Sequence, residues 1–518
     1  MAYGITTPIY YVNAAPHLGH AYTTIAADVL ARHMRQRGEE VFFLTGTDEH
    51  GEPVAHAAEA LGVSPQELAD GNAARFQALM PQLEASNDFF IRTSDPEHHA
   101  RVREILSGVR DAGYVYLGPY EGWYCPRCAD FKTDAEMGPD HTCPIHEIPL
   151  TRESEENWFF ALSRFQEPLE RLYAERPDWV GPPGRANEAR AFIASGLADV
   201  SLSRAGLSWG VRVPWDEEQV FYVWFDALLN YVTALGYARP GTDLTQRFWP
   251  AAVQLIGKDI LKFHTVYWPA LLMAAGLEVP RRIFVHGFLL GADGRKMSKS
   301  LGNVLDPFAV MDRYGTDALR FYLLRDVTFG QDGPVSEVGV DRRYHAELAN
   351  EYGNLASRTL AMVARYRDRR VPEAPLDAAL AGTLGGLEAR VAALIDRCEL
   401  TPALEAIWQS VRRLNRYVEQ RVPWQQARDP DAAAELDTTL VSLVEGLRVV
   451  TVLLHPYLPA ATTRLLEALG EHGPTALSLT HAGAGGSAAA PGGGSPLCGR
   501  TLSTLAPLFP RVTPAAAP

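Results

Sequence analysis

"YGITTPIYYVNAAPHLGH", residues 3–20, decides the fold, because it reads as a buried strand followed by a loop that opens a helix. Apolar residues at helical spacing continue through Ile25, Val29 and Met34 and end at Gly38, a residue typical of helix C-termini. "EVFFLTG", residues 40–46, then predicts the next strand. A strand–loop–helix–strand unit of this kind usually begins a nucleotide-binding parallel sheet.

A second unit of the same kind lies far downstream. It consists of "VQLIG", a helix from about Asp259 to Ala275 closed by Gly276, and "RIFVHGF". From about Asp341 onward strand patterns end and long amphipathic patterns such as "AIWQSVRRLNRYVEQ" predict a helical bundle. The predicted fold is therefore α/β, with a split Rossmann-type parallel sheet, an inserted domain and an all-α C-terminal bundle.

The expected divisions follow from these patterns. They are the first half of the nucleotide-binding domain at 1–114, an inserted domain at 115–215, the second half at 216–290, a connecting region at 291–340, and a helical domain at 341–518 with a low-complexity loop at 482–495.

Composition limits the function classes. The chain has 518 residues, which is too long for one ordinary core, and its net charge of -14 excludes a general polyanion binder. Any nucleic-acid partner must therefore meet a local basic surface. The N-terminus has no signal-peptide pattern and no apolar run reaches about 18 residues, so we expect a cytoplasmic protein without a membrane span.

Two short pairs of metal-ligand residues predict one metal site. "CPRC" supplies Cys125 and Cys128, and "CPIH" supplies Cys143 and His146 after fourteen intervening residues. Two thiolate or imidazole pairs of this spacing make a closed tetrahedral site, so we expect one structural zinc ion. A redox disulfide between Cys125 and Cys128 is the alternative, but it leaves the second pair unexplained.

The lysines are few and clustered. Only five of the 48 basic residues are lysine, and four of these five lie in "GKDILK" (257–262) and "GRKMSKS" (294–300). Compact ammonium groups on flexible stems can follow moving phosphate charge, which the rigid guanidinium fork does less well. The glycines around the second block indicate a mobile loop, although an ordinary solvated surface loop is the alternative. "HLGH" at 17–20 likewise suits phosphate at a helix N-terminus, or is a capping turn with incidental histidines.

Together "HLGH" and "KMSKS" resemble the two signature motifs of class I aminoacyl-tRNA synthetases. From "TTPIYYVNAAPHLGH" through "GTDEHG", "YVWFDALLNY", "IGKDILKFH" and "GRKMSKSLGNV" to "PLFPR", the chain resembles the bacterial methionyl-tRNA synthetases with a single zinc knuckle. The resemblance implies ATP-dependent formation of methionyl-adenylate and pyrophosphate, followed by transfer of methionine to the 3′ end of tRNA. Such an enzyme supports both initiation and elongation of translation.

The resemblance also assigns the nucleotide site. Catalysis is mostly positioning and electrostatic stabilisation of the leaving phosphates, with Mg²⁺ assisting. The residues implied to act on the phosphates are His17, His20, Lys296 and Lys299. Those implied to bind ATP are Asn13, Gly19, Gly257, Asp259 and again Lys299.

A methionine site needs an apolar slot for the thioether and a carboxylate for the ammonium group. By resemblance, Asp48 of "GTDEHG" binds the ammonium group. The slot is implied to contain Ile9, Tyr11, Trp224, Ala227, Leu228, Tyr231, Ile260 and His264. Residue by residue, ordinary core packing or turn capping is the alternative, and Leu228 replaces a proline that some relatives have.

The helical end is expected to bind RNA. Asn350, Asn354 and Arg358 recur every four residues and so share a helix face, while Trp424 lies just past a helix end at Pro423. Amides and guanidinium suit base edges, and a protruding indole can stack on an unpaired base. A solvated face and a packed tryptophan are the alternatives. By resemblance these residues read the CAU anticodon of initiator and elongator tRNA(Met).

Three other functions remain open from the residues alone. They are a different class I synthetase, a tRNA-independent nucleotidyltransferase and a catalytically idle RNA-binding protein. The inserted segment is too short for the editing domain of the valine, isoleucine and leucine enzymes, which favours methionine. Because the chain ends at "PLFPRVTPAAAP", without the dimerising domain of some relatives, we expect a monomer.

Overall fold

The computed structural model describes residues 2–127, 130–132, 136–297, 303–482 and 495–512. The chain divides into two compact units. Unit 1 contains Met1–Pro16, Val41–Pro81 and Ser86–His286, and unit 2 contains His17–Glu40, Gln82–Ala85 and Gly287–Pro518. The helix that begins with "HLGH" therefore groups with the C-terminal part of the chain.

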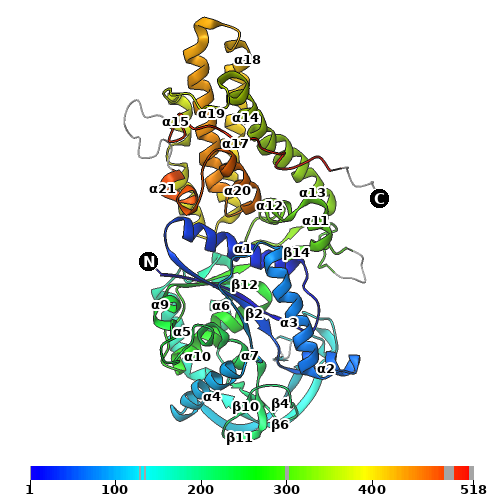
Figure 1. Cartoon of the computed structure of the whole chain (residues 1–518). Helices are drawn as coiled ribbons and strands as arrows, with labels where there is room; N and C mark the ends of the chain where they lie inside the picture. Colours follow the sequence, from blue (N-terminus) through cyan, green and yellow to red (C-terminus); the bar gives the residue numbers. More distant parts are fainter. Residues whose placement is uncertain (1, 128–129, 133–135, 298–302, 483–494, 513–518) are drawn as a thin grey trace. The chain divides into compact units, whose positions relative to one another are not determined.

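Unit 1 is built on a six-stranded sheet of strand order β3-β2-β1-β12-β13-β7. Its strands β2 and β12 are labelled in Figure 1. Its strands are β1 (Ala2–Tyr11), β2 (Glu40–Asp48), β3 (Phe89–Arg92), β7 (Val180–Gly181), β12 (Ala252–Gly257) and β13 (Arg282–His286). β1 and β12 pair in parallel with Ile5 beside Val253. Every residue of β12 is buried, as in a parallel sheet covered on both faces. The pairing joins the two halves and confirms the predicted split Rossmann-type sheet.

The segment after β12 is helical over the range that the sequence predicts, but it is not a regular α-helix throughout. It consists of the 3-10 turn η4 (Lys258–Ile260), the π-helical turn η5 (Phe263–Tyr267) and α10 (Trp268–Ala274). Pro269 has no N–H to donate to the carbonyl oxygen of Thr265, four residues earlier. The hydroxyl of Tyr173 donates to that oxygen instead, across 3.0 Å.

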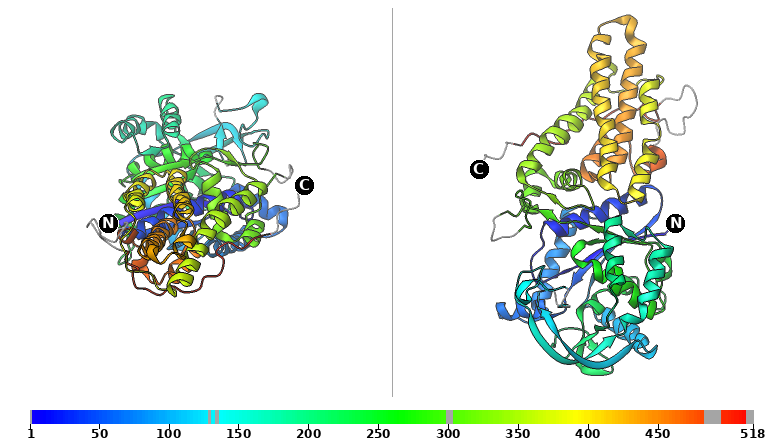
Figure 2. Two further views of the ribbon diagram at one scale, coloured as in Figure 1. Left: turned by 90° about the horizontal axis from the view of Figure 1, so that it is seen from above. Right: turned by 180° about the vertical axis from the view of Figure 1, so that it is seen from behind.

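The inserted segment forms a second sheet of order β5-β4-β6-β8. Its long strands β4 (Val115–Cys125) and β6 (Thr151–Phe160) pair antiparallel from Val115 beside Phe160 to Tyr124 beside Thr151, and form the cyan ribbon in Figure 2. The short strands are β5 (Asp130–Lys132) and β8 (Val200–Ser201). The segment predicted as inserted also supplies β7 to the main sheet, where Val180 lies beside Ile283. A two-residue strand has no periodicity from which the sequence could predict it.

Further helices and strands of unit 1 surround these sheets. They are α2 (Glu52–Leu61), α3 (Pro65–Gln82), α4 (Pro96–Asp111), η1 (Pro139–His141), η2 (Leu162–Phe165), α5 (Gln166–Glu175), α6 (Pro183–Ala194), β9 (Ser203–Arg204), β10 (Arg212–Val213), β11 (Asp216–Phe221), α7 (Val223–Ala227), α8 (Asn230–Thr233), α9 (Thr245–Phe248) and η3 (Trp249–Ala251). Their packing buries Trp179, Trp249 and Trp268 almost completely.

Unit 2 is helical, as predicted, apart from the two-residue strands β14 (Leu289–Leu290) and β15 (Gly333–Pro334) among the described residues. Its longest helices, α17 (Leu400–Arg421) and α19 (Ala433–Leu454), run side by side in Figures 1 and 2. The others are α1 (Leu18–Gln36), α11 (Pro307–Tyr314), α12 (Thr316–Asp326), α13 (Glu337–Arg343), the π-helix η7 (Tyr344–Gly353), α14 (Asn354–Arg367), α15 (Ala378–Leu384), α16 (Leu387–Asp396), α18 (Pro423–Gln426), η8 (Pro430–Ala432), α20 (Pro459–Ala468), η9 (Pro474–Leu477) and α21 (Leu479–Ala482).

A buried ion pair fixes α1 within unit 2. Arg320 of α12 donates to Oδ2 of Asp28 across 2.7 Å, and neither side chain is exposed. The same guanidinium donates to the carbonyl oxygens of Leu83, Pro456 and Tyr457. Because each of the three nitrogens of this buried cation donates to an acceptor, its burial is compensated. The helix that carries His20 is therefore held by Arg320, a residue almost three hundred positions later in the sequence.

One described stretch, Ala378–Asp396, is long and apolar enough to resemble a membrane span by length and composition. In the structure it is two helices, α15 and α16, which Gly385 and Gly386 separate. Gly386 has a φ of 75°, which ends helical geometry. Each helix is far shorter than the roughly 20 residues that cross a bilayer.

Candidate functional site

His17 and His20 together cap the start of α1. Nδ1 of His17 accepts a hydrogen bond from the backbone N–H of Gly19 across 3.1 Å. Nδ1 of His20 accepts from the backbone N–H of His17, also across 3.1 Å, and the two rings stack with centroids 3.7 Å apart. The structure thus confirms the capping turn, and a phosphate-binding role for the two histidines stays a prediction.

This cap fixes where the ring hydrogens lie. Because Nδ1 accepts in both imidazoles, a neutral ring carries its hydrogen on Nε2. Burial, and then the charge of His17, lower the pKa of His20 well below its ordinary value, so His20 is neutral at pH 7. An Nε2–H donor beside a helix N-terminus suits a negatively charged oxygen.

Gly19 is required by the position of the His17 ring. A Cβ atom on residue 19 would lie 2.9 Å from Cε1 and 3.1 Å from Nδ1 of His17. Contacts this short force the ring to move, and the Nδ1 bond to the backbone would be lost. The glycine in "HLGH" thus has a steric reason that the sequence alone did not supply.

The lysine stretch begins as a tight hairpin in unit 2. Leu290 pairs with Lys296, whose ammonium group lies 5.6 Å above the ring of Phe288. The amide of Asn303 donates to Oδ1 of Asp293 across 3.2 Å, which closes the base of the stretch. Lys299 lies outside the described residues.

The other candidate ATP-binding residues belong to unit 1. Asn13 and Asp259 are exposed, and Gly257 ends β12. A Cβ on Gly257 would lie 2.5 Å from Oδ1 of Asp259, so glycine is needed for the observed position of that carboxylate. His17, His20 and Lys296 belong to unit 2, so their convergence with these residues around one triphosphate stays a prediction.

Aromatic rings gather around Trp224 on α7. Its indole stacks on Phe263 with centroids 3.8 Å apart and an interplanar angle of 4°. Tyr11 meets the same indole edge-on at 6.4 Å, and His264 does so at 6.2 Å. The structure thus brings together three of the residues assigned to the methionine slot and adds Phe263, which the sequence reasoning missed although "KFH" contains it.

The protonation of His264 is defined by its two neighbours. Nδ1 faces the carbonyl oxygen of Ile260 at 3.1 Å, so it carries the hydrogen. Nε2 lies 2.8 Å from the hydroxyl of Tyr231 and accepts from it. Burial lowers the pKa of His264 to about 4, against a smaller upward effect of the bond to Ile260, so the ring is neutral at pH 7.

Asp48 presents a buried carboxylate at the end of β2. Its side chain is 2% exposed, and Oδ1 has no hydrogen-bond partner among the described residues. Burial, and then the charge of Asp226, raise the pKa of Asp48 well above its ordinary value, against smaller downward effects of hydrogen bonds from the backbone of His50 and the side chain of Tyr11. A bound cation would remove this cost, because an opposite charge favours the ionised carboxylate.

The remaining members of the predicted slot are apolar and line the same core. Leu228 is buried within the main core of unit 1, and its neighbour Ala227 is also buried. Ile9 and Ile260 are half-buried and pack against that core. The core accepts leucine at position 228, the place where some relatives have proline.

Several buried polar residues were missed although three of them, Glu49, His50 and Asp226, lie inside the quoted motifs. Asp226 of "YVWFDALLNY" bonds His50 of "GTDEHG" and also His98. The carboxylate of Glu49, next to Asp48, accepts hydrogen bonds from Nε and Nη2 of Arg92 at 2.7 and 2.8 Å. The signal that could have identified them is their charge, because a buried charge needs a partner.

Unit 1 also contains a cavity of about 180 Å³ beside the motif segments. Gly51 of "GTDEHG" and Tyr222 and Val223 of "YVWFDALLNY" line it together with Tyr124 and Arg204. The guanidinium of Arg204 lies 4.1 Å above the ring of Tyr222. The sequence carries no local signal for this cavity, because its walls come from separate segments.

Three of the four candidate metal ligands cluster in the inserted segment. The ligand atoms of Cys125, Cys143 and His146 all lie within 4.8 Å of one another, and Nδ1 of His146 is 3.8 Å from each sulfur. Cys128 lies outside the described residues. His141, which the spacing argument leaves out, stacks on Trp123 at 4.1 Å instead.

These separations fit a zinc ion. With Zn–S of about 2.3 Å and Zn–N of about 2.1 Å, tetrahedral geometry places sulfur and nitrogen roughly 3.6 Å apart. Cys143 sits in a tight turn in which its N–H bonds the carbonyl oxygen of Ile148 and its carbonyl oxygen accepts from Glu147. The donor set of two buried thiols and an imidazole therefore suits this metal.

The candidate anticodon residues are exposed or half-exposed in unit 2. Asn350 and Asn354 are exposed on η7 and α14, and Arg358 lies with its guanidinium carbon 6.0 Å from the ring centre of Trp424. Trp424 is 39% exposed, so the packed-core alternative is wrong. It does not follow a helix end at Pro423: α17 ends at Arg421, and Trp424 belongs to the short helix α18.

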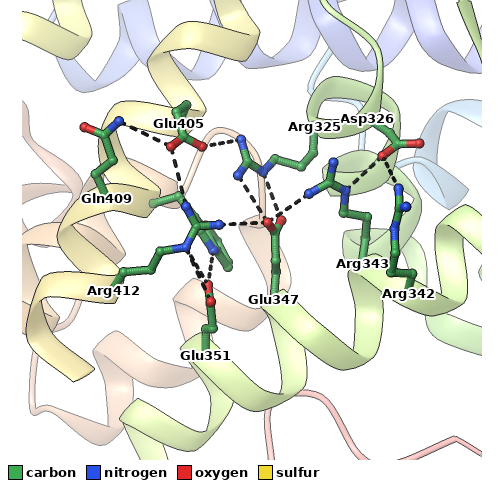
Figure 3. Close-up of polar contacts among 10 residues, drawn as sticks. Arg325, Asp326, Arg342, Arg343, Glu347, Glu351, Glu405, Gln409 and Arg412 are labelled. Atoms are coloured by element: carbon green, nitrogen blue, oxygen red, sulfur yellow. Dashed lines mark hydrogen bonds and ion pairs between the residues drawn. The ribbon is translucent and has the colours of Figure 1, made fainter. Parts of the chain in front are cut away.

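An ion-pair network holds the helix that carries Asn350 (Figure 3). Buried Glu347 of η7 accepts from Arg325 at 2.9 and 3.1 Å, from Arg343 at 2.9 Å and from Arg412 at 3.0 Å. One turn later Glu351 accepts from the indole of Trp408 at 2.6 Å. Side chains of α12, α13 and α17 thus hold the π-helix, which is a rare form in proteins.

Comparison with known proteins agrees with these features. A family model described as tRNA synthetases class I (M) matches residues 3–152 and 140–360. The methionine–tRNA ligase of Streptomyces coelicolor is 43% identical over 99% of this chain and 97% of the relative, and that of Thermosynechococcus vestitus is 46% identical over 90% of each. Methionyl-tRNA synthetase of Mycobacterium tuberculosis, solved in complex with methionyl-adenylate, superposes with a TM-score of 0.92 at 42% identity, covering 98% of this chain and 100% of that one.

The family-model match covers well over half of the chain, and the relatives exceed 40% identity across nearly all of it. The chain therefore belongs to the methionyl-tRNA synthetases, a family of class I aminoacyl-tRNA synthetases.

Proposed function

We propose that the chain activates L-methionine with ATP, giving methionyl-adenylate and pyrophosphate, and then transfers the methionyl group to the 3′ end of tRNA(Met). The methionine carboxylate attacks the α-phosphate, and negative charge grows on the departing pyrophosphate. Catalysis of such a step rests on positioning and on stabilising that charge.

The single observation that carries this proposal is the carboxylate of Asp48. Its Oδ1 is buried without a hydrogen-bond partner among the described residues, in the unit that also holds the aromatic rings around Trp224. A substrate that supplies an ammonium group to Asp48 and an apolar, polarisable side chain to the rings meets both needs. Methionine has these two groups. The predicted slot members Ile9, Tyr11, Ala227, Leu228, Tyr231, Ile260 and His264 are proposed to line it.

The phosphates of ATP are assigned to the residues of the two signature motifs. His17 and His20 donate from Nε2, and Lys296 and Lys299 neutralise the leaving pyrophosphate. ATP is taken as its Mg²⁺ complex, which supplies further positive charge. Asp259 is proposed to hold the ribose, with Asn13, Gly19 and Gly257 allowing close approach of the backbone.

The zinc ion is proposed to be structural. Cys125, Cys128, Cys143 and His146 would hold it, and a site with four protein ligands leaves no open position for substrate. Its role is to fold the end of β4, because a cluster of only a few apolar residues surrounds Cys125 and Cys143.

The helical unit is proposed to read the CAU anticodon of initiator and elongator tRNA(Met) through Asn350, Asn354, Arg358 and Trp424. The exposed amides and the half-exposed indole support this assignment, because base edges and base faces require such groups. We also propose that the chain acts as a monomer in the cytoplasm, with divisions at 1–114, 115–215, 216–290, 291–340 and 341–518.

Methionine-dependent exchange of pyrophosphate into ATP tests the activation step. We expect exchange with L-methionine and none above background with leucine or cysteine. Exchange with one of those instead would assign another class I synthetase, and RNA binding without any exchange would leave an idle RNA-binding protein. Exchange without tRNA charging would indicate a nucleotidyltransferase.

Charging of tRNA tests the anticodon assignment. Trp424→Ala should reduce charging of tRNA(Met) by about tenfold or more, as loss of one stacked base predicts, while exchange is retained. A tRNA(Met) transcript with a changed anticodon should be charged equally poorly by the unaltered protein and by Trp424→Ala. Equal loss of exchange and charging would contradict a role for Trp424 in reading RNA.

A further inference from the structure

Asp226 joins two histidines from distant parts of unit 1. Its carboxylate is fully buried on α7, between Trp224 and Ala227. Oδ2 lies 2.5 Å from Nδ1 of His50, and Oδ1 lies 2.7 Å from Nε2 of His98 on α4. Both oxygens of one buried carboxylate are thus occupied by imidazoles.

The directions of these bonds are defined by charge. Burial alone would raise the pKa of Asp226, but the charge and hydrogen bond of His50 and the hydrogen bond of His98 hold it below its ordinary value. The carboxylate is therefore ionised and can only accept, so both imidazole nitrogens that face it carry hydrogens. Such charge-assisted bonds are roughly twice as strong as neutral ones. The second nitrogen of His98 faces the hydroxyl of Thr233 at 2.7 Å, which extends the contact to α8.

His50 lies two residues after Asp48, and the chain between them is held on its other side. The carbonyl oxygen of Asp48 accepts from the N–H of Val12 at 3.3 Å. The N–H of Glu49 donates to the hydroxyl of Thr93 at 2.9 Å, and the carboxylate of Glu49 binds Arg92. These bonds tie residues 48 and 49 to β1 and to the end of β3. The hydrogen bond from His50 to Asp226 adds a further connection, which joins this segment to α7.

We propose that Asp226 is a positioning residue for the amino-acid site: through His50 it holds the segment that carries Asp48 against the helix that carries Trp224 and Ala227. The inference rests on the proposed methionine slot, since it concerns how the two walls of that slot are kept at a fixed separation. A bond between the walls matters because the ammonium group and the thioether belong to one small substrate. A shift of about 1 Å between them would spoil the fit.

Steady-state pyrophosphate exchange with purified full-length variants tests the proposal. Asp226→Asn keeps the shape but can no longer accept from both rings, so KM for methionine should rise about tenfold or more while KM for ATP stays within about twofold. His50→Ala removes the same link and should give the same split. His50→Asn retains a donor at the place of Nδ1 and should recover most of the loss. Asp226→Asn combined with His50→Ala should be little worse than either alone, because residues that act as a unit are not additive.

A matched control separates positioning from stability. Asp216→Asn alters another acidic side chain of unit 1, which accepts from the indole of Trp158 at 2.9 Å, and should leave KM for methionine unchanged. Folding is followed by thermal denaturation of each variant. If Asp226→Asn does not fold, the comparison of His50→Ala with His50→Asn tests the proposal instead. A lowered melting temperature with unchanged KM for methionine in His50→Ala overturns the inference, as do additive effects in the double variant. Absence of methionine-dependent exchange in the unaltered protein contradicts the proposed function itself, which is a distinguishable failure.

Discussion

The hydroxyl of Tyr231 donates to Nε2 of His264 across 2.8 Å in the interior of unit 1. The other ring nitrogen donates to the carbonyl oxygen of Ile260, so the imidazole is held at both ends. Trp224 meets this ring edge-on, which places the fixed imidazole against one wall of the proposed methionine slot. Two of the predicted slot residues are thus hydrogen-bonded to each other. Removing this bond should change both the free energy of unfolding and the affinity for methionine.

Tyr231→Phe removes the hydroxyl group and leaves a buried acceptor on His264 without its donor. Such a loss costs about 1–3 kcal/mol, so we expect the free energy of unfolding to fall by that amount. KM for methionine should rise several-fold, because the ring of His264 is no longer fixed. Urea denaturation and pyrophosphate exchange measure the two effects. Tyr116→Phe, which loses an exposed bond to Asp199, is the control and should change neither. A variant as stable as the parent would contradict the assigned bond.

Stability should fall as the pH drops below about 6.5, and His264 should account for part of this. Burial lowers its pKa to about 4, whereas the unfolded chain has a value near 6.5. Between these values the unfolded state binds a proton that the folded state does not, so the free energy of unfolding decreases with decreasing pH. The full effect is about 3 kcal/mol at pH 4.

Urea denaturation between pH 7 and pH 5 compares the parent with His264→Gln. The variant should lose less stability over this range, whatever its stability at pH 7. His472→Gln, which alters an exposed histidine, should follow the parent. Parallel curves for the parent and His264→Gln would show that residue 264 does not titrate in this way.

The sequence predicted the parts of the fold that rest on local patterns. The buried runs of β1, β2, β12 and β13 and the amphipathic helix α17 were all apparent from hydrophobic spacing. The π-helices η5 and η7 were not, since over one or two turns their apolar spacing cannot be told from that of an α-helix. The grouping of α1 with unit 2 depends on Asp28 and Arg320, which are 292 residues apart.

The same limit applies to the candidate site. Motif residues such as His17, Asp48 and Trp224 could be named because each motif is a short stretch. Asp226 and His98 are 128 residues apart, and no pattern along the chain pairs them. Gly19 could be identified as a loop residue, but only the structure shows that a Cβ would strike the ring of His17.

Gly19→Ala should impair adenylate formation more than methionine binding. The added Cβ would lie 2.9 Å from Cε1 of His17 and push the ring out of the cap. A misplacement of about 1 Å at a reacting centre can cost about a hundredfold in rate. Single-turnover formation of methionyl-adenylate measures the rate, and equilibrium dialysis measures methionine binding. Gly71→Ala, where a Cβ would meet no atom within 4 Å, should leave the rate unchanged. A normal rate for Gly19→Ala would remove His17 from the phosphate site.

Removal of the metal should unfold the end of β4 without altering the chemistry directly. The purified protein should contain about one zinc ion per chain. Cys143→Ser should lose the metal and melt at a lower temperature, since one buried thiolate is replaced by a poor ligand. Cys498→Ser, remote in sequence from the knuckle, should retain the full metal content. Metal analysis by mass spectrometry checks both, and full zinc occupancy in Cys143→Ser would contradict the ligand assignment.

Lys299→Arg tests whether the scarce lysines mark places where arginine fails. The guanidinium keeps the charge but not the compact, strongly hydrated ammonium group that can follow the pyrophosphate as it leaves. We expect adenylate formation to slow by at least about tenfold, because stabilisation of developing charge depends on close placement of the donor. Methionine affinity should be nearly unchanged, since Lys299 is not assigned to the amino-acid slot. The control, Arg295→Lys, makes the opposite replacement at an exposed residue nearby and should leave the rate of adenylate formation unchanged. If Lys299→Arg forms adenylate at the parent rate, charge alone is sufficient at this position and the bias toward arginine carries no functional information.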